Sequence, residues 1–390
     1  MKSGKSTTKP ARYEHKITLG KDYNGRLIRK SFYSTKSKAD AKRKAEKYKA
    51  RYDIELLCGG EPERPRILFK DWALQCLDLY KKPYVKGNTY NGTYLAPTKL
   101  HLMPVFGPMP LDAILPIHIQ KYINDASKKY APETVKKDFT VLSFILQHAA
   151  DNGLCSANAA SKSIILPKYE TVTTKRAYTR AEYDTVYAFA KTHPDGLSIM
   201  LLMETGISRS ELLGLRWEDL DAESGVLHIR QGLTAYCDMD GQQWKLEAQG
   251  LKNKYRRRAI PIIDSELLRR LREKPREITI TSRCSVEKGA VVRTEYIFHS
   301  PEGQPYQPHN WGHRVYDRFM EDMAAQYPHI PKLSPHELRH TRTTLWLAQG
   351  ISPYMVGKLL GHSGTQMLAK VYDHTTVDTL RTVLTNAQET

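Results

Sequence analysis

Hydrophobic and polar positions follow two different periods along the chain, and the change of period divides it into regions. Near the N-terminus, residues 13–19 and 27–33 alternate at every second position. They flank Asn24-Gly25, a dipeptide typical of a tight hairpin turn. Residues 37–57 are rich in Ala, Lys and Glu, which favour a helix. We therefore expect a small hairpin or three-stranded sheet that is backed by one helix.

A helical period replaces this alternation beyond a Gly- and Pro-containing linker at residues 58–65. Apolar residues then recur every three to four positions in four stretches, which are 69–80, 89–103, 117–127 and 134–150. Gly153 follows the last stretch as a suitable stop. The pattern predicts an all-helical region between the linker and about residue 167.

The remainder of the chain mixes both periods. Thr179 and Glu182 match a capping box at the start of a helix. Residues 197–203 predict an apolar helix, and residues 226–229 alternate as a strand. A long hairpin follows, for which we expect residues 232–250 to form the tip.

Length supports this division, because 390 residues are too many for one average core. We expect a multidomain α+β protein with three domains. These are a small β-sheet-plus-helix domain at 1–58, an all-helical domain at 66–168, and a mainly helical domain with a small β-sheet at 176–390.

The net charge of the chain indicates what kind of partner it binds. The formal net charge is +18, and the first 52 residues, with 12 Lys and 5 Arg against 4 acidic residues, carry +13 of it. Such a balance is typical of a protein that binds nucleic acid rather than a membrane surface. The chain has no apolar run of 18 residues and no signal-peptide pattern after Met1, so we expect it in the bacterial cytoplasm, at the nucleoid.

Cysteine and carboxylate patterns exclude several chemistries. The five cysteines are widely separated and form no C-x-x-C pair, which indicates neither a disulfide framework nor a zinc site. The sequence also lacks a phosphate-cradling glycine loop and the carboxylate clusters that two-metal nucleases need. We therefore expect no cofactor and no metal.

Residues that can bind an anion gather near the C-terminus. Ser334 and Glu337 match a capping box at the start of a helix. On that helix His336 and Arg339 are i,i+3 neighbours and His340 is i,i+4 from His336, so the three side chains can face one point. A guanidinium and two imidazoles at one point suggest an anion, although each residue alone also suits a solvated helix face.

A second helix over 353–360 ends at Gly361, which presents His362 at a helix boundary, and Tyr372 follows ten residues later. The three elements H-E-L-R-H, L-G-H-S and Tyr resemble, in order and spacing, the C-terminal signature of tyrosine recombinases of the phage-integrase type. The resemblance implies that Tyr372 is the nucleophile and that Arg339, His336 and His362 bind the scissile phosphate.

Phosphoryl chemistry explains these residue types. A phosphodiester repels an incoming oxyanion and gains charge in the transition state, so preplaced cations and imidazole donors lower the barrier. Attack by a tyrosine oxygen keeps the bond energy in a phosphotyrosyl ester instead of losing it to water.

One motif departs from the family pattern. The pattern T-G-x-R would place an arginine at position 208, where this chain has Ser208 followed by Arg209. Ser208 and Glu211 match a capping box, which would leave Arg209 at the first position of a helix, beside its anion-attracting end. We expect Arg209 to act as the first catalytic arginine. The alternative is a centre that Ser208 impairs.

Two basic segments resemble further parts of the family. The start of the run 251–258 resembles the P-K-T hairpin, which implies that Lys252 donates a proton to the leaving 5′ oxygen. The N-terminal region resembles the arm-site-binding domain of conjugative-transposon and phage integrases, where a sheet enters a DNA groove; a plain basic tail is the alternative. The residues expected to contact DNA are Lys16, Arg26, Arg29, Lys30, Lys254, Arg256, Arg257 and Arg258.

The resemblance implies a site-specific recombinase, the integrase or excisionase-dependent transposase of a mobile element, that exchanges strands through a 3′-phosphotyrosyl intermediate and a Holliday junction. The expected partners are double-stranded DNA with core and arm sites, a homo-tetramer in the synaptic complex, and an excisionase or host DNA-bending protein. After Tyr372, an apolar stripe that should dock on another protomer is formed by Val377, Leu380, Val383 and Leu384. The alternatives are a type IB topoisomerase-like strand transferase, which needs no arm domain, and a sequence-specific DNA-binding protein with an impaired catalytic centre.

Overall fold

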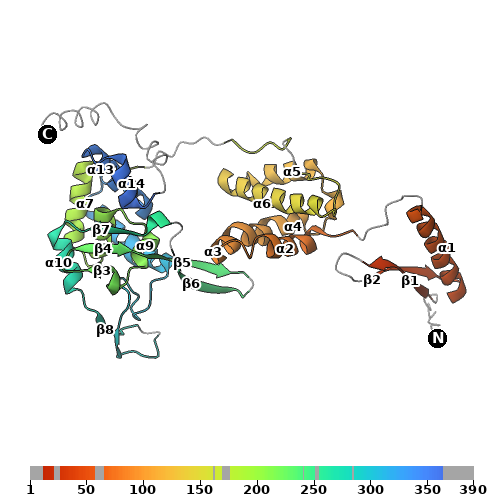
Figure 1. Cartoon of the computed structure of the whole chain (residues 1–390), viewed down its shortest axis with the longest axis horizontal. Helices are drawn as coiled ribbons and strands as arrows, with labels where there is room; N and C mark the ends of the chain where they lie inside the picture. The colour runs from red at the N-terminus through yellow and green to blue at the C-terminus, as the bar shows by residue number, and fades with distance from the viewer. Residues whose placement is uncertain are drawn as a thin grey trace, which may run out of the picture. The chain divides into compact units, whose positions relative to one another are not determined.

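The computed structural model of the chain describes residues 12–21, 27–57, 66–160, 163–168, 176–239, 241–250, 254–282 and 285–362 (Figure 1). The chain folds into two compact units, Met1–Tyr84 with Tyr94–Lys168 and Val85–Thr93 with Tyr169–Thr390. The expected α+β class is confirmed, because a hairpin with one helix, a helical region and a mainly helical region with small sheets follow one another along the chain.

The N-terminal region is an antiparallel hairpin covered by one helix. Strands β1 (Tyr13–Lys21) and β2 (Leu27–Ser34) pair with a bulge between Thr18 and Gly20, and α1 (Lys38–Leu57) packs on them. The side chains of α1 that pack towards the hairpin are small or aromatic, and Ala41 and Ala45 are fully buried. The hairpin and the helix match the prediction, whereas the predicted turn residues Asn24 and Gly25 lie outside the described residues.

All four predicted helical stretches after the linker are helical. Their elements are α2 (Phe69–Tyr80), α3 (Gly87–Thr89), η1 (Tyr90–Leu95), η2 (Thr98–Leu102), α4 (Met103–Phe106), η3 (Leu111–Ala113), α5 (Pro116–Ala126) and α6 (Pro132–Asp151). The stretch 89–103 is not one regular helix, because η1 and η2 are π-helical and Pro97, which has no amide hydrogen to donate, lies between them. Across the bundle, the indole of Trp72 in α2 donates to the carbonyl oxygen of Ile145 in α6 at 3.0 Å.

The C-terminal unit surrounds three short antiparallel strands with helices. The strands β3 (Leu220–Asp221), β4 (Val226–Ile229) and β7 (Arg258–Pro261) form one sheet, while β5 (Gln231–Asp238) pairs with β6 (Gln243–Gly250) and β8 (Glu277–Thr279) with β9 (Val291–Arg293). The helices are α7 (Arg180–Thr192), α8 (Gly196–Thr205), α9 (Arg209–Leu213), η4 (Trp217–Asp219), η5 (Lys254–Arg256), α10 (Ser265–Glu273), α11 (Pro308–Trp311), η6 (Gly312–Asp317), α12 (Arg318–Gln326), α13 (Pro335–Ala348) and α14 (Pro353–Leu360).

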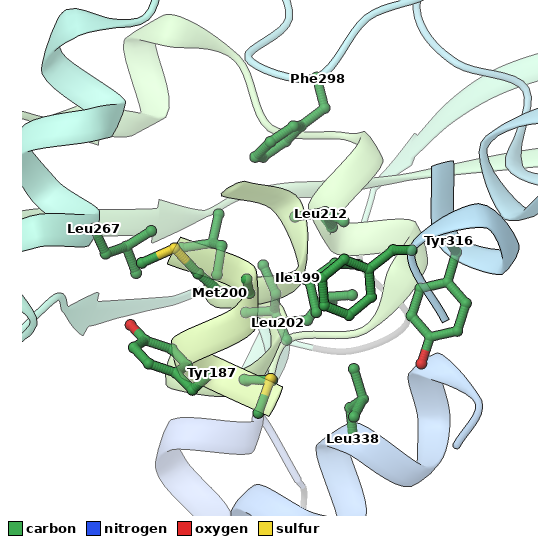
Figure 2. Packing of buried hydrophobic residues seen from close by; sticks show 14 of the residues in the cluster. Tyr187, Ile199, Met200, Leu202, Leu212, Leu267, Phe298, Tyr316 and Leu338 are labelled. Carbon is green, nitrogen blue, oxygen red and sulfur yellow. The ribbon is translucent and has the colours of Figure 1, made fainter. Parts of the chain in front are cut away.

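Helix α8 forms the centre of this unit because it is apolar on every side. Figure 2 shows Ile199, Met200 and Leu202 of α8 among side chains from several other elements, including Leu212 of α9 and Leu338 of α13. Each fully buried aliphatic side chain contributes about 1.5–3 kcal/mol of hydrophobic stabilisation. This packing fixes α9 and α13 against the same central helix.

The predicted hairpin is present, but its tip was misplaced. Residues 232–250 lie mostly in the paired strands β5 and β6, which meet between Asp238 and Gln243. Most side chains of this ribbon are partly or largely exposed, so its sequence lacks the alternation that a half-buried sheet shows. Within the described ranges, no helix combines the length and apolarity that crossing a membrane requires.

Candidate active site

The start of α13 positions the first group of candidate residues. The Ser334 backbone N–H donates to Glu337 Oε2 at 2.8 Å, and the Glu337 N–H donates to Ser334 Oγ at 3.4 Å, so the predicted capping box is confirmed. Leu338 points into the core (Figure 2), and the neighbouring Arg339 is buried as well. His336, one turn before Arg339, is exposed on the first turn of the helix.

The guanidinium of Arg339 is held by backbone carbonyls from two other elements. Nη1 donates to the Gly206 carbonyl oxygen at 2.9 Å, and Nη2 donates to the Leu360 carbonyl oxygen at 2.6 Å. Only 7% of the residue is exposed. Burial lowers the pKa of Arg339 to about 10 although Glu211 acts to raise it, so the side chain remains protonated at neutral pH.

Both carbonyls depend on glycines at helix ends. Gly206 ends α8 with φ of 61°, and a Cβ there would lie 3.1 Å from Leu360 Cδ2. Gly361 ends α14 with φ of 72°, and a Cβ there would lie 2.9 Å from Arg258 Nη1. The left-handed backbone and the close approach both favour glycine, and the predicted C-cap at Gly361 is confirmed.

His362 follows this cap and contacts the same guanidinium. Its Nε2 lies 3.2 Å from Arg339 Nη2. Burial, together with the positive charges of Arg339, Arg256 and Arg258, lowers the pKa of His362 to about 4, so the ring is neutral at pH 7. Because an arginine N–H can only donate, we assign the ring proton to Nδ1.

A buried carboxylate lies beneath these cations. Glu211 forms a capping box with Ser208. It also forms a bidentate ion pair with Arg258, in which the Nη1–Oε1 distance is 2.9 Å and the Nη2–Oε2 distance is 3.1 Å. Its Oε2 also lies 3.5 Å from Arg339 Nη1. Burial acts to raise the pKa of Glu211, but the hydrogen bonds and charge of Arg258, together with the charge of Arg339, lower it to about 2.

The structure corrects the expectation for Arg258. Its side chain is only 6% exposed, and it also donates to the backbone carbonyl of Leu359 at 2.6 Å. It therefore stabilises the site from below rather than contacting DNA. Arg257 is exposed, as a DNA contact requires, while Arg256 is half-buried. Lys254 begins η5, and the position of its side chain lies outside the description.

Arg209 is at the first position of α9, and Ser208 caps that helix, as the sequence predicted. The guanidinium of Arg209 is exposed and lies beside Gly312, where an added Cβ would be 4.0 Å from Nη1. Among the described residues, the charges that act on the pKa of Arg339 are those of Glu211, Arg258 and Arg256, and that of Arg209 is not one of them. The structure thus brings Arg339, His362, Glu211 and Arg258 together but leaves Arg209 outside this group, which we call the arginine–histidine cluster.

Three of the remaining predicted residues can be placed on the N-terminal hairpin. Thr18 pairs with Arg29 and Lys16 pairs with Ser31, so Lys16 and Arg29 share the exposed face. Lys30 lies on the other face, where its Nζ is 3.9 Å from the centre of the Tyr48 ring of α1. The expectation for Lys30 is therefore corrected, because this side chain packs against α1.

Several predicted residues lie outside the described residues. These are Arg26, Lys252, Tyr372 and the tail residues Val377, Leu380, Val383 and Leu384. In the described part of the chain, no group of three or more His, Cys, Asp or Glu side chains could hold a metal ion.

Sequence reasoning missed two members of the site. It named Glu211 only as a capping residue, and it grouped Arg256 with its neighbours as a phosphate contact. The positive charge of Arg256 acts on both Arg339 and His362 and lowers the pKa of each. No local signal separates Arg256 from the other arginines of the run, because the difference arises from contacts distant in sequence.

Comparisons with protein families match most of the chain. The model described as the phage integrase family matches residues 176–378, and the model of the phage integrase N-terminal SAM-like domain matches residues 68–127. A tyrosine recombinase XerC-like protein of Caldanaerobacter subterraneus subsp. tengcongensis is 27% identical over 378 residues, which is 93% of this chain and 92% of that protein. The transposase from transposon Tn916 of Enterococcus faecalis is 22% identical over 76% of this chain and 72% of its own.

Solved structures with a similar fold include two integrases bound to DNA. The Tn1549 transposon integrase in complex with a circular intermediate DNA has a TM-score of 0.64 at 19% identity, with 82% of this chain and 99% of that chain covered. The lambda integrase tetramer bound to a Holliday junction has a TM-score of 0.54 at 18% identity, with 90% and 93% covered. At such identities the likeness concerns the fold.

Proposed function

This chain belongs to the phage integrase family and is a tyrosine site-specific recombinase; we propose that its arginine–histidine cluster holds a scissile DNA phosphate for attack by Tyr372. In this proposal Arg339 neutralises the phosphate, and His362 and His336 donate hydrogen bonds to its oxygens. Lys252 protonates the leaving oxygen. The roles of Tyr372 and Lys252 are assigned from the sequence pattern alone, because both residues lie outside the described residues.

The observation that carries the proposal is an excess of buried positive charge. The side chains of Arg339 and Arg258 are both buried, and the charge of Arg256 acts on the same site. Among the described residues, Glu211 is the one carboxylate whose charge acts on both Arg339 and His362. Glu211 is already engaged by Arg258 through both of its oxygens. Two buried arginines therefore share one carboxylate, and a buried site that keeps a net positive charge is stabilised by an anion such as a phosphodiester.

The proposed reaction conserves the number of phosphate ester bonds. The oxygen of Tyr372 attacks phosphorus and its hydroxyl proton passes to solvent, a 3′-phosphotyrosyl bond forms, and the bond to the 5′ oxygen breaks while Lys252 gives that oxygen a proton. The 5′ hydroxyl of a second strand then attacks the phosphotyrosyl ester and releases Tyr372. Repetition on the other strand pair passes through a Holliday junction and completes the exchange.

The proposed substrate is duplex DNA with two kinds of site. The helical region and the C-terminal unit would bind core sites, and the hairpin with α1 would bind arm sites through Lys16, Arg29 and the charge of residues 1–52. Lambda integrase, which has a similar fold, has been solved as a tetramer on a Holliday junction. We extend that assembly to this chain as a homo-tetramer, assisted by an excisionase or a host DNA-bending protein.

A covalent trapping experiment tests the proposal. Duplexes from the ends of the mobile element that encodes the chain, each nicked near the cleavage position, would be incubated with the protein with and without EDTA. We expect a covalent protein–DNA adduct in both conditions with the natural chain and no adduct with Tyr372→Phe, which should still bind DNA. Adduct formation by Tyr372→Phe would contradict the assignment. Binding without an adduct by the natural chain would support the alternative of a DNA-binding protein with an impaired centre.

A further inference from the structure

The arginine–histidine cluster contains two guanidiniums, but that of Arg258 is bound to Glu211 through two hydrogen bonds, which leaves Arg339 to face a phosphate. A phosphodiester carries charge on two non-bridging oxygens in its transition state. A second cationic fork is needed to stabilise the second oxygen to the same degree. The position at which the family pattern has this arginine is Ser208, whose side chain caps α9. The neighbouring Arg209 lies beside Gly312, outside the cluster.

The backbone of Arg256 lies beside two residues at this cluster, Arg258 and Gly361. Arg256 is the last residue of η5 and is separated from β7 by Arg257 alone, and its backbone carbonyl accepts a hydrogen bond from Arg258 Nη1 at 2.9 Å. A Cβ added to Gly361 would lie 3.0 Å from the Arg256 Cα. Gly361 stands between Leu360, whose carbonyl holds Arg339, and His362, so the Arg256 backbone lies next to both contacts.

The environment of Arg256 differs from that of both arginines that follow it. Arg258 is committed to Glu211 through two hydrogen bonds and is buried. Arg257 is exposed. Arg256 is half-buried, and its charge reaches Arg339 and His362, whose pKa values it lowers. Of the three consecutive arginines, Arg256 is therefore the one placed both to reach solvent and to act on the cluster.

We propose that Arg256 supplies the second guanidinium on the scissile phosphate, in the role that the family pattern gives to an arginine at position 208. This inference rests on the proposed function, because it assumes that the cluster binds a scissile phosphate. The buried ion pair between Glu211 and Arg258 holds the Arg256 backbone in place, and the arginine fork then reaches the oxygen that Arg339 does not cover. Loss of the arginine at position 208 is thereby compatible with an active centre.

Single-turnover cleavage separates this role from ordinary DNA binding. The rate of adduct formation at saturating protein would be measured for Arg256→Ala, with Arg257→Ala as the matched control from the same basic run. We expect Arg256→Ala to slow the reaction by about 10²–10³-fold, the size observed when one preorganised oxyanion donor is lost. Arg257→Ala removes an expected DNA contact, so it should act on the affinity for DNA, and saturating protein should offset most of its effect. Arg256→Lys, which keeps the charge but loses the fork, should recover part of the rate.

A substrate with a methylphosphonate at the scissile position provides a ratio of rates that a structural defect in the variant would leave unchanged. Replacing one charged non-bridging oxygen by a methyl group removes the charge that Arg256 is proposed to neutralise. The ratio of the natural rate to the Arg256→Ala rate should therefore fall by at least tenfold on this substrate. A ratio that is unchanged would overturn the proposal, because it would mean that Arg256 acts through folding or general binding.

The outcomes distinguish the inference from the proposed function. If the natural chain forms no adduct on any end duplex, the proposed function fails and the inference fails with it. If the natural chain forms the adduct and Arg256→Ala reacts at the natural rate, only the inference is wrong. In that case Arg209→Ala, made in parallel, should carry the 10²–10³-fold loss; a loss confined to Arg256→Ala supports the inference.

Discussion

At the scale of single residues, the cluster shows what local spacing can predict and what it cannot. The motif order predicted that Arg339 and His362 would meet, and their nitrogens are 3.2 Å apart. The same reasoning treated Arg256 and Arg258 alike, because both belong to one basic run. Their difference comes from Glu211, which lies 47 residues before Arg258 in the chain and pairs with it. A contact over such a separation leaves no mark in the spacing of the run.

The neutral state of His362 leads to a prediction about pH. Its pKa is lowered from 6.5 to about 4 by burial and by three arginines, while Glu211 opposes the shift. Between pH 6.5 and pH 4 the unfolded chain therefore takes up a proton that the folded chain excludes, and stability falls as the pH falls through this window. Substituting His362→Gln removes this proton uptake. The variant should lose less stability than the natural chain between pH 7 and pH 4.5, as measured by the urea midpoint of unfolding.

His309→Gln, which changes an exposed histidine of α11, is a suitable control. Only the change between the two pH values is compared, because the substitution also alters packing at both. Equal pH-dependent losses in the natural chain and in His362→Gln would show that His362 is not held in its neutral form by the cluster.

At the scale of secondary-structure elements, helix boundaries were the best predicted features. The capping boxes at Thr179, Ser208 and Ser334 all form, because each depends on residues only three positions apart. The ribbon of β5 and β6 was the least well predicted element. Neither of its faces is consistently buried, so its sequence does not need to alternate between apolar and polar residues. Hydrogen bonds between residues that are close in sequence can therefore be predicted from this sequence, whereas the strands of an exposed two-stranded ribbon cannot.

The hairpin register provides a prediction with an internal control. Arg29 lies on the exposed face together with Lys16, while Lys30, the next residue, packs over the Tyr48 ring of α1. Arg29→Ala should weaken binding to arm-site duplex and reduce the log–log salt slope by about 0.9, because one phosphate contact is lost. Lys30→Ala should leave the slope unchanged and lower the stability of the N-terminal region.

Both variants would be compared by fluorescence anisotropy at several salt concentrations and by thermal unfolding. Equal slope changes for the two variants would mean that the exposed face of the hairpin is not the DNA-binding face. Loss of binding by Arg29→Ala at every salt concentration with an unaltered slope would point to misfolding rather than to a missing phosphate contact.

At the scale of the whole molecule, charge is distributed in a way that favours two DNA contacts of different kinds. The first 52 residues carry +13 of the net +18, so the remaining 338 residues carry only +5. The C-terminal unit instead concentrates a few arginines at one buried cluster. A region that binds by many exposed charges is strongly salt-dependent, whereas a site that recognises one phosphate depends on geometry. This division agrees with the proposal that the N-terminal region binds arm sites while the C-terminal unit cleaves core sites.

Assembly of several protomers leads to the last prediction, which concerns the segment after Tyr372. Val377, Leu380, Val383 and Leu384 form one apolar stripe at helical spacing, although these residues lie outside those that the structure describes. An apolar stripe on a helix needs burial against another surface, so we expect it to dock on another protomer. Deleting residues 377–390 should leave binding to a single core site unchanged and lower the yield of the paired-site complex. Mass photometry of the protein with one-site and two-site duplexes measures both quantities.

The double variant Leu380→Ala with Leu384→Ala should reproduce the effect of the deletion, whereas Arg381→Ala on the polar face should not. An unchanged yield of paired-site complex after the deletion would contradict docking of the tail.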